Sequence, residues 1–197
     1  IAAVAQVELR TRRSADEYGT MVRVEGSTVT SQEVCACPTG TTIYVRNLFF
    51  NVPARRNFLK SPPVELRHVI DEFQRVALIH PHVAFTMTHN DKEAFHLTTG
   101  SFKQRIVGIM GGIFNERLLS VGQEAAKIKV EGFVVKPEFS KKTRGDQFFF
   151  VNNRFIRHPY LHHAIENAFA DLLPKETFPG YFIHFSIDPA EIDVNIH

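Results

Sequence analysis

The sequence predicts an α+β fold with two layers of strands and helices in tandem. Apolar and polar residues alternate with a period of two at Val7–Arg13, as expected for a half-buried strand. Apolar residues then recur at helical spacing from Pro63 to about His80. Alternation returns at Lys127–Val135, after a change of composition near Thr99-Gly100. We therefore expect one domain over residues 1–98 and a second over 99–197.

The remaining elements of the first half follow from the same patterns. A short helix is expected at Ala54–Lys60, because Pro53 suits the first turn of a helix. The other strands of this half are expected at Gly19–Gly26, Glu33–Cys37, Thr42–Leu48, Val83–Thr88 and Ala94–Thr98.

The second half begins with a helix at Phe102–Met110, before the helix-stopping Gly111-Gly112. Asn tolerates a positive φ angle, so Asn152-Asn153 predicts a tight hairpin turn. The segments around this turn are expected as strands at Gln147–Val151, Arg154–Ile156, Tyr181–Ile187 and Asp193–Ile196, and as a helix at Leu161–Leu173.

Composition limits the class of protein. Of 197 residues, 44% are hydrophobic and 22% are charged, which is typical of a folded domain and not of a disordered chain. No apolar run reaches the roughly 18–20 residues of a membrane-spanning helix. Cys35 and Cys37 are too few and too close for a disulfide framework, which favours a reducing compartment. The start at Ile1, without Met, and the end at His197 indicate a fragment.

The net charge is only +2, but basic residues cluster. Lys136–His162 contains six Lys and Arg residues against two acids, whereas the chain from His163 onward contains one Lys against six acids. Clustered positive charge in a balanced protein suits a phosphate-binding face, although solvated surface charge gives the same pattern.

The segment Gly40–Phe58 carries the most specific pattern. A turn glycine followed by Thr41 opens a strand, where the backbone can approach a ligand and a hydroxyl can hydrogen-bond to it. A simple turn before a strand explains the same two residues. The whole string GTTIYVRNLFFNVPARRNF resembles a motif of the MutL family of DNA mismatch repair proteins. Phe150–Arg154 (FVNNR) and Asp188–His197 (DPAEIDVNIH) resemble two further motifs of that family, in the same order.

The resemblance implies a fold and the identity of each domain. MutL proteins are GHKL ATPases, like gyrase, the ninety-kilodalton heat-shock chaperone and histidine kinases. Residues 1–98 would then be the C-terminal portion of a Bergerat-type ATPase sandwich, and residues 99–197 a ribosomal-protein-type β-α-β transducer domain with its helices on one face of the sheet. The general-base Glu, the magnesium-binding Asn, the adenine-binding Asp-x-Gly-x-Gly and the transducer Lys of the family have no counterpart in this sequence.

The nucleotide site is therefore expected to be partial. Gly40 and Thr41 are its only candidate residues, no catalytic residue is assigned, and no metal ligand is assigned. The intact protein would use ATP and Mg²⁺ as a slow ATPase, whereas neither is expected on this fragment alone. This fragment by itself is expected to be inactive, because the main ATP-binding motifs of the family are absent from its sequence.

DNA is the implied partner of the second domain. Arginines at a hairpin end can bind backbone phosphates with their guanidinium forks, and Arg154 and Arg157 are placed for this role. Solvated arginines, or arginines paired with the acidic C-terminal region, are the alternative. The loop before the hairpin adds the candidate contacts Lys141, Lys142 and Arg144.

The remaining implications concern structural residues and partners. The resemblance assigns motif positions to Asn51, Pro53, Ala54, Arg55, Asn152, Asp193 and Asn195. It implies a homodimer in the bacterial cytoplasm, near the nucleoid, that couples mismatch recognition by MutS to downstream repair enzymes, with no membrane partner. Two alternatives remain: the transducer half of another GHKL protein, such as a type II topoisomerase or a chaperone, and a protein-interaction module without a DNA role.

Overall fold

A computed structural model describes residues 1–192, and the expected strand Asp193–Ile196 lies outside that range. The chain divides into two compact units, Ile1–Leu66 and a second unit that begins at Arg67. The expected boundary near residue 98 falls inside the second unit, because Ala77, Leu78 and Leu97 share one hydrophobic core with Ile106. A division of the chain into compact units need not coincide with the division into family domains, so the domain boundary at residue 98 stays a prediction.

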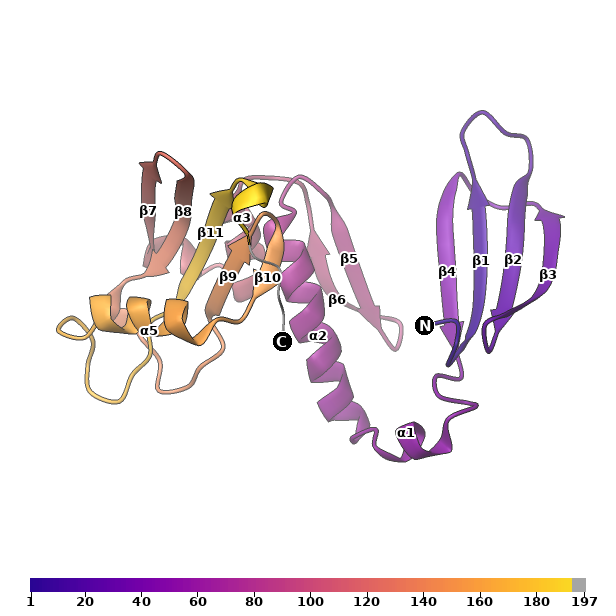
Figure 1. The fold of residues 1–197 in the computed structure, drawn as a ribbon, viewed down its shortest axis with the longest axis horizontal. Helices are drawn as coiled ribbons and strands as arrows, with labels where there is room; N and C mark the ends of the chain where they lie inside the picture. The colour runs from indigo at the N-terminus through magenta and orange to yellow at the C-terminus, as the bar shows by residue number, and fades with distance from the viewer. Residues whose placement is uncertain (193–197) are drawn as a thin grey trace. The chain divides into compact units, whose positions relative to one another are not determined.

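The first unit is a four-stranded antiparallel sheet in the order β3-β2-β1-β4 (Figure 1). Its strands are β1 (Gln6–Arg12), β2 (Gly19–Glu25), β3 (Thr28–Cys35) and β4 (Gly40–Arg46). β3 begins five residues before the expected Glu33. Its first residues, Thr28–Gln32, pair with the end of β2, and that pairing extends the strand across a polar sequence.

The two faces of this sheet differ, because side chains alternate along each strand. Ile43 and Val45 lie on an apolar face and are 59% and 47% exposed, so this face is open within residues 1–192. The opposite face buries Glu8, which accepts hydrogen bonds from Arg23 Nε at 2.9 Å and Arg10 Nε at 2.8 Å. The bond from Arg23 holds the pKa of the Glu8 carboxyl below its usual range, against the opposing effect of burial.

Two helices follow the first sheet. α1 (Pro53–Asn57) begins at Pro53 and ends three residues before the expected Lys60. α2 (Pro62–Ile79) buries only its last residues, Ala77, Leu78 and Ile79, in the core of the second unit.

The second unit contains a hairpin, a five-stranded sheet and short helices (Figure 1). The sheet order is β10-β9-β11-β8-β7, and only the β9·β11 pair is parallel. β9 reaches β11 through β10 and α5, which gives the β-α-β arrangement that the resemblance implies. The elements are β5 (Phe85–His89), β6 (Lys92–Leu97), α3 (Phe102–Met110), α4 (Phe114–Arg117), β7 (Leu118–Ala125), β8 (Ile128–Val135), the 3₁₀ helix η1 (Pro137–Phe139), β9 (Gln147–Val151), β10 (Arg154–Ile156), α5 (Pro159–Ala168), β11 (Tyr181–Ile187) and the 3₁₀ helix η2 (Pro189–Glu191).

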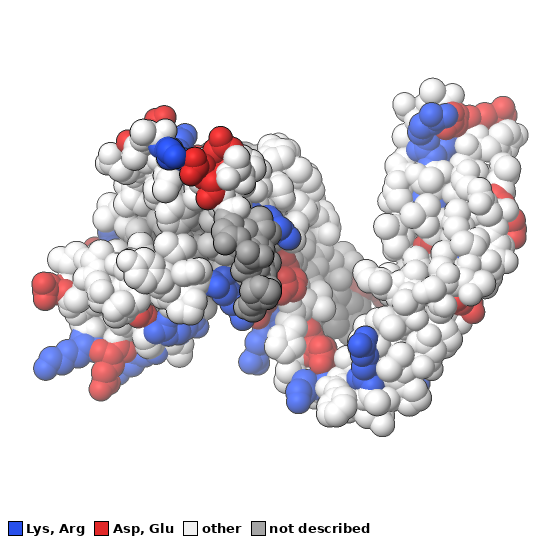
Figure 2. All heavy atoms as spheres, viewed as in Figure 1, with Lys and Arg blue, Asp and Glu red and all other residues white. Residues whose placement is uncertain are grey.

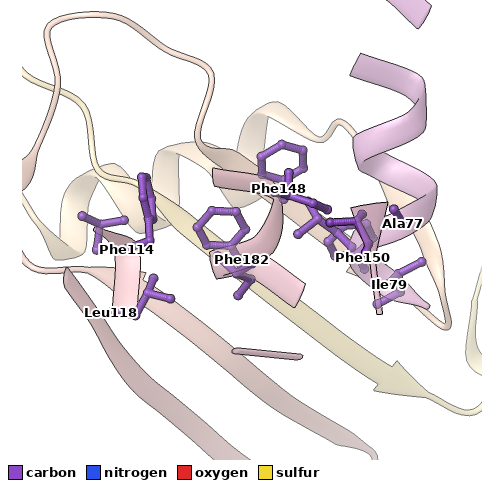
Figure 3. Packing of buried hydrophobic residues seen from close by; sticks show 12 residues of the cluster. Ala77, Ile79, Phe114, Leu118, Phe148, Phe150 and Phe182 are labelled. Atoms are coloured by element: carbon purple, nitrogen blue, oxygen red, sulfur yellow. The ribbon is translucent and has the colours of Figure 1, made fainter. Parts of the chain in front are cut away.

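Both faces of the sheet are covered, which corrects the expectation of helices on one face. Phe148 and Phe150 point into a core shared with α2, α3 and α4, where the rings of Phe148 and Phe182 stack with centroids 5.4 Å apart (Figure 3). Phe149 points to the other face, where it joins a second cluster with Leu161 and Ile165 of α5. Three consecutive phenylalanines therefore suit a strand that is covered on both faces.

A buried arginine fastens α3 to the elements around it. Arg105 is 2% exposed and donates hydrogen bonds to the backbone carbonyls of Ala77, Pro81, Val83 and Thr98 at 2.5–3.1 Å. Burial lowers the pKa of this guanidinium. Ser101 caps the same helix with a reciprocal pair of bonds to Gln104.

Three further features differ from the expectation. β7 and α4 were not predicted, because β7 is a mostly exposed edge strand with a polar sequence and α4 is a single turn. α5 ends at Ala168, five residues before the expected Leu173, and its chain continues as turns toward Pro174. Among residues 1–192, no helix is both long and apolar enough to cross a membrane.

Candidate functional site

The β9–β10 hairpin presents the main candidate residues. Asn152 and Asn153 have φ angles of +43° and +67°, as the predicted tight turn requires. The Asn152 side chain donates to Ile187 O at 2.7 Å and accepts from Ile187 N at 3.0 Å. Its backbone N–H donates to Phe185 O at 3.0 Å. Asn152 thus fixes the turn to the end of β11, which explains why this position carries an amide side chain.

Arg154 is the first residue of β10 and Arg157 directly follows its last residue, and both are exposed. Across residues 1–192, neither forms an ion pair with an acidic side chain. The guanidinium of Arg157 lies 6.0 Å from the centre of the Phe155 ring. These two cations are therefore available for an external anion.

The loop before β9 holds its cations differently. Lys141 Nζ lies 2.6 Å from a carboxylate oxygen of Asp146, and Arg144 Nη2 lies 2.7 Å from Glu166. Lys142 is exposed, and the part of the chain that is described offers it no ion pair. Figure 2 shows Lys and Arg side chains below α5, where this loop lies, beside acidic ones. Acidic side chains of the same chain therefore neutralise part of the positive charge of this loop.

One cavity joins the two basic segments. A space of about 570 Å³ in the second unit is lined by Arg144 and Arg157, together with Arg75 of α2. Arg154 is not part of its wall. Arg75 was not a candidate, since it lies some seventy residues earlier and its spacing fits an ordinary helix surface. Only the tertiary fold reveals its role in the cavity.

A polar chain runs along the same wall. Arg144 hydrogen-bonds Nε2 of His162, and Nδ1 of His162 hydrogen-bonds the hydroxyl of Tyr181. Because Arg144 has only donors, His162 accepts at Nε2 and carries its proton on Nδ1. Burial, followed by the charge of Arg144, lowers the pKa of His162. Burial also raises the pKa of Tyr181, so both rings stay neutral near pH 7.

Gly40 and Thr41 lie in the first unit, at the start of β4. Gly40 has a φ angle of +115°, and a Cβ placed there would meet no atom within 4 Å. The open space and the conformation suit close approach of a ligand to the backbone. The Thr41 hydroxyl hydrogen-bonds the Thr11 hydroxyl at 2.8 Å. A partial nucleotide contact at these two positions stays a prediction.

The other motif positions have local roles. Asn51 donates to Ala3 O at 3.0 Å and ties the loop after β4 to the start of the chain. Pro53 opens α1, where Ala54 and Arg55 are exposed. Asp193 and Asn195 lie outside the described residues. Within residues 1–192, no group of three or more His, Cys, Asp or Glu side chains is arranged to hold a metal ion.

Sequence comparison identifies relatives of this chain. Residues 106–197 match the family described as DNA mismatch repair protein, C-terminal domain. The chain is 55% identical over all 197 residues to the DNA mismatch repair protein MutL of Christiangramia forsetii, and 53% identical to that of Flavobacterium johnsoniae. It covers 32% and 31% of those proteins, so it spans about a third of the length of the curated relatives it matches.

Structural comparison gives the same family. The chain resembles the Aquifex aeolicus MutL ATPase domain complexed with ADP, with a TM-score of 0.75 and 26% identity over 96% of this chain and 70% of that one. This likeness confirms the GHKL fold that the sequence motifs imply. The match to the mismatch repair family favours MutL over a topoisomerase or a chaperone, the other GHKL alternatives.

Proposed function

Because the chain belongs to the MutL family of DNA mismatch repair proteins, we propose that it acts in mismatch repair as a DNA-binding and coupling region of an ATP-dependent protein. Residues 1–98 would be the end of the ATPase domain and residues 99–197 the transducer domain. One observation supports the DNA contact most: Arg154 and Arg157 are exposed cations without ion pairs among the described residues, on a hairpin that Asn152 holds in place.

Nucleotide use is the second part of the proposal. The backbone at Gly40 and the hydroxyl of Thr41 would hold part of an ATP molecule, whose binding and slow hydrolysis with Mg²⁺ would supply the free energy of a conformational cycle. This chain contributes no general base, so we assign it no catalytic residue. Its own contribution is to couple the nucleotide contact structurally to the DNA contact.

The DNA contact is proposed to be independent of sequence. Arg154, Arg157 and Lys142 lie on a hairpin and a loop, and they can neutralise phosphates without reading base edges. In the intact homodimer, the protein would then link mismatch recognition by MutS to downstream repair enzymes. A place in the bacterial cytoplasm, near the nucleoid, follows from a DNA ligand.

A mutation-rate assay tests the proposal. Cells whose only copy of the full-length protein carries Arg154→Glu and Arg157→Glu should show a spontaneous mutation rate close to that of cells lacking the protein. Lys92→Glu, an exposed charge reversal at the first residue of β6, is the matched control and should leave the rate unchanged. A double variant that repairs mismatches as well as the parent would contradict a DNA role for this hairpin.

A further inference from the structure

The cavity that joins Arg144 and Arg157 lies within the second unit and has a distinct chemistry. Three arginines line it, whereas Asp71 is its one acidic lining residue among the described ones. Its other polar lining residues include two histidines, His158 and His162, and two glutamines, Gln74 and Gln147. Drug-sized ligands occupy pockets of roughly 300–1,000 Å³, and this space of about 570 Å³ falls in that range.

Aromatic rings hold the guanidinium groups in place. Arg75 lies 4.6 Å from the centre of the Phe155 ring, and Arg144 lies 4.2 Å from that of Phe178. A guanidinium that rests on a ring loses little further freedom when it binds an anion, so less affinity is lost to ordering. Arg157 is the cation of this wall that no acidic side chain neutralises within residues 1–192.

The start of α5 adds to the positive character of the same wall. The N-cap residue His158 and the first helical residue Pro159 line the cavity, and no side chain caps the helix. Its first turn also contains no acidic residue. The N-terminal end of the helix dipole therefore favours an anion there, in addition to the arginines.

Part of the wall is apolar. Phe155, Ile156 and Pro159 offer a surface for a ring or a sugar, beside the cations that would hold a phosphate. The continuous backbone of a duplex is too broad to enter such a space, whereas one nucleotide with its phosphate fits. A phosphate carried by a flat apolar body is the chemistry of a nucleoside monophosphate.

We propose that this cavity binds a nucleoside monophosphate group, either as a free nucleotide or as the 5′-phosphorylated end of a DNA strand. Arg157 and Arg144 contact the phosphate, and Phe155 with Pro159 contacts the nucleoside. The strand-end form deepens the DNA-binding function proposed above and rests on it. It adds a preference for phosphorylated ends that backbone contacts by Arg154 do not supply.

Fluorescence anisotropy of the full-length protein tests this proposal. The probes are two short single strands of one sequence, labelled at the 3′ end, with either a 5′-phosphate or a 5′-hydroxyl. The phosphorylated strand should bind about tenfold more tightly, as expected for charge-assisted bonds to one added phosphate group. Arg157→Gln should abolish this ratio. Arg154→Gln, three residues earlier and outside the cavity wall, should weaken both probes alike and preserve the ratio.

Competition with thymidine monophosphate distinguishes the two ligand sources. Displacement of the phosphorylated strand by the nucleotide, in the parent but not in Arg157→Gln, supports a site for the free monophosphate. Resistance to the nucleotide with an intact end preference supports the strand end. Equal affinity for both probes together with no competition overturns the cavity proposal, while salt-sensitive binding of both probes leaves the DNA-binding function in place. If neither probe binds at any salt concentration, both proposals are wrong. An unchanged thermal midpoint of Arg157→Gln shows that the variant folds.

Discussion

Replacing Asn152 should loosen the hairpin that carries Arg154. The Asn152 side chain forms two hydrogen bonds to the backbone of Ile187, at 2.7 and 3.0 Å. At about 1 kcal/mol net for each bond, Asn152→Gly should destabilise this hairpin by about 2 kcal/mol while it keeps the positive φ angle. Asn152→Ala should cost about 1 kcal/mol more, because alanine is strained at a φ angle of +43°.

Native-state hydrogen exchange of the β10 amides in the full-length protein measures this effect. Every 1.4 kcal/mol corresponds to a factor of ten, so exchange should accelerate about 30-fold in Asn152→Gly and about 150-fold in Asn152→Ala. Asn153→Gly is the control, since Asn153 shares the turn but its side chain has no hydrogen-bond partner among the described residues. Parent-like exchange in both Asn152 variants would refute this role of the amide.

Two further predictions concern the stability of the second unit. Arg105→Met should leave four backbone carbonyls without their donor and destabilise the unit by about 3–4 kcal/mol. Scanning calorimetry should show this as a lower thermal midpoint, whereas Lys103→Met on the same helix should change the midpoint little. Equal midpoints for the parent and Arg105→Met would contradict the role of Arg105. His162 has a lowered pKa in the folded state, so the unfolded chain binds its proton first as the pH falls. Stability should be constant above about pH 6.5 and decrease below it. Thermal unfolding over a pH series should show this slope in the parent and a smaller one in His162→Gln, and identical slopes would contradict the assignment.

Local sequence patterns predicted the elements that depend on neighbouring residues, such as a capped helix, a tight turn and a strand. α3 has the expected bounds, because Ser101 caps it and Gly111 ends it. The Asn152-Asn153 turn was predicted from the tolerance of Asn for positive φ angles. The strand Gln147–Val151 was predicted, and its period of two places Phe148 and Phe150 on one face of the sheet and Phe149 on the other.

Features that depend on distant partners were not predictable. Arg105 resembles any helix-surface arginine in sequence, yet the backbone carbonyls that surround it come from α2 and from the loops before β5 and after β6. Arg75 and Tyr181 reach one cavity from segments more than a hundred residues apart. Similarly, Asp146 and Glu166 neutralise Lys141 and Arg144, which spacing cannot reveal. The sequence therefore predicted a basic region. It did not predict a cavity, nor which of the basic side chains form ion pairs with acidic residues.

The salt dependence of DNA binding tests the central claim most directly. Lys142, Arg154 and Arg157 form no ion pair within residues 1–192, and each should release counterions from one phosphate, at a slope of about −0.9 in log K against log salt per contact. On a matched duplex, replacing all three by Gln in the full-length protein should therefore flatten the slope by about 2.7, and a mismatched duplex should behave alike. Lys92→Gln should leave the slope unchanged. Equal slopes for the parent and the triple variant would contradict a DNA-binding hairpin in this chain.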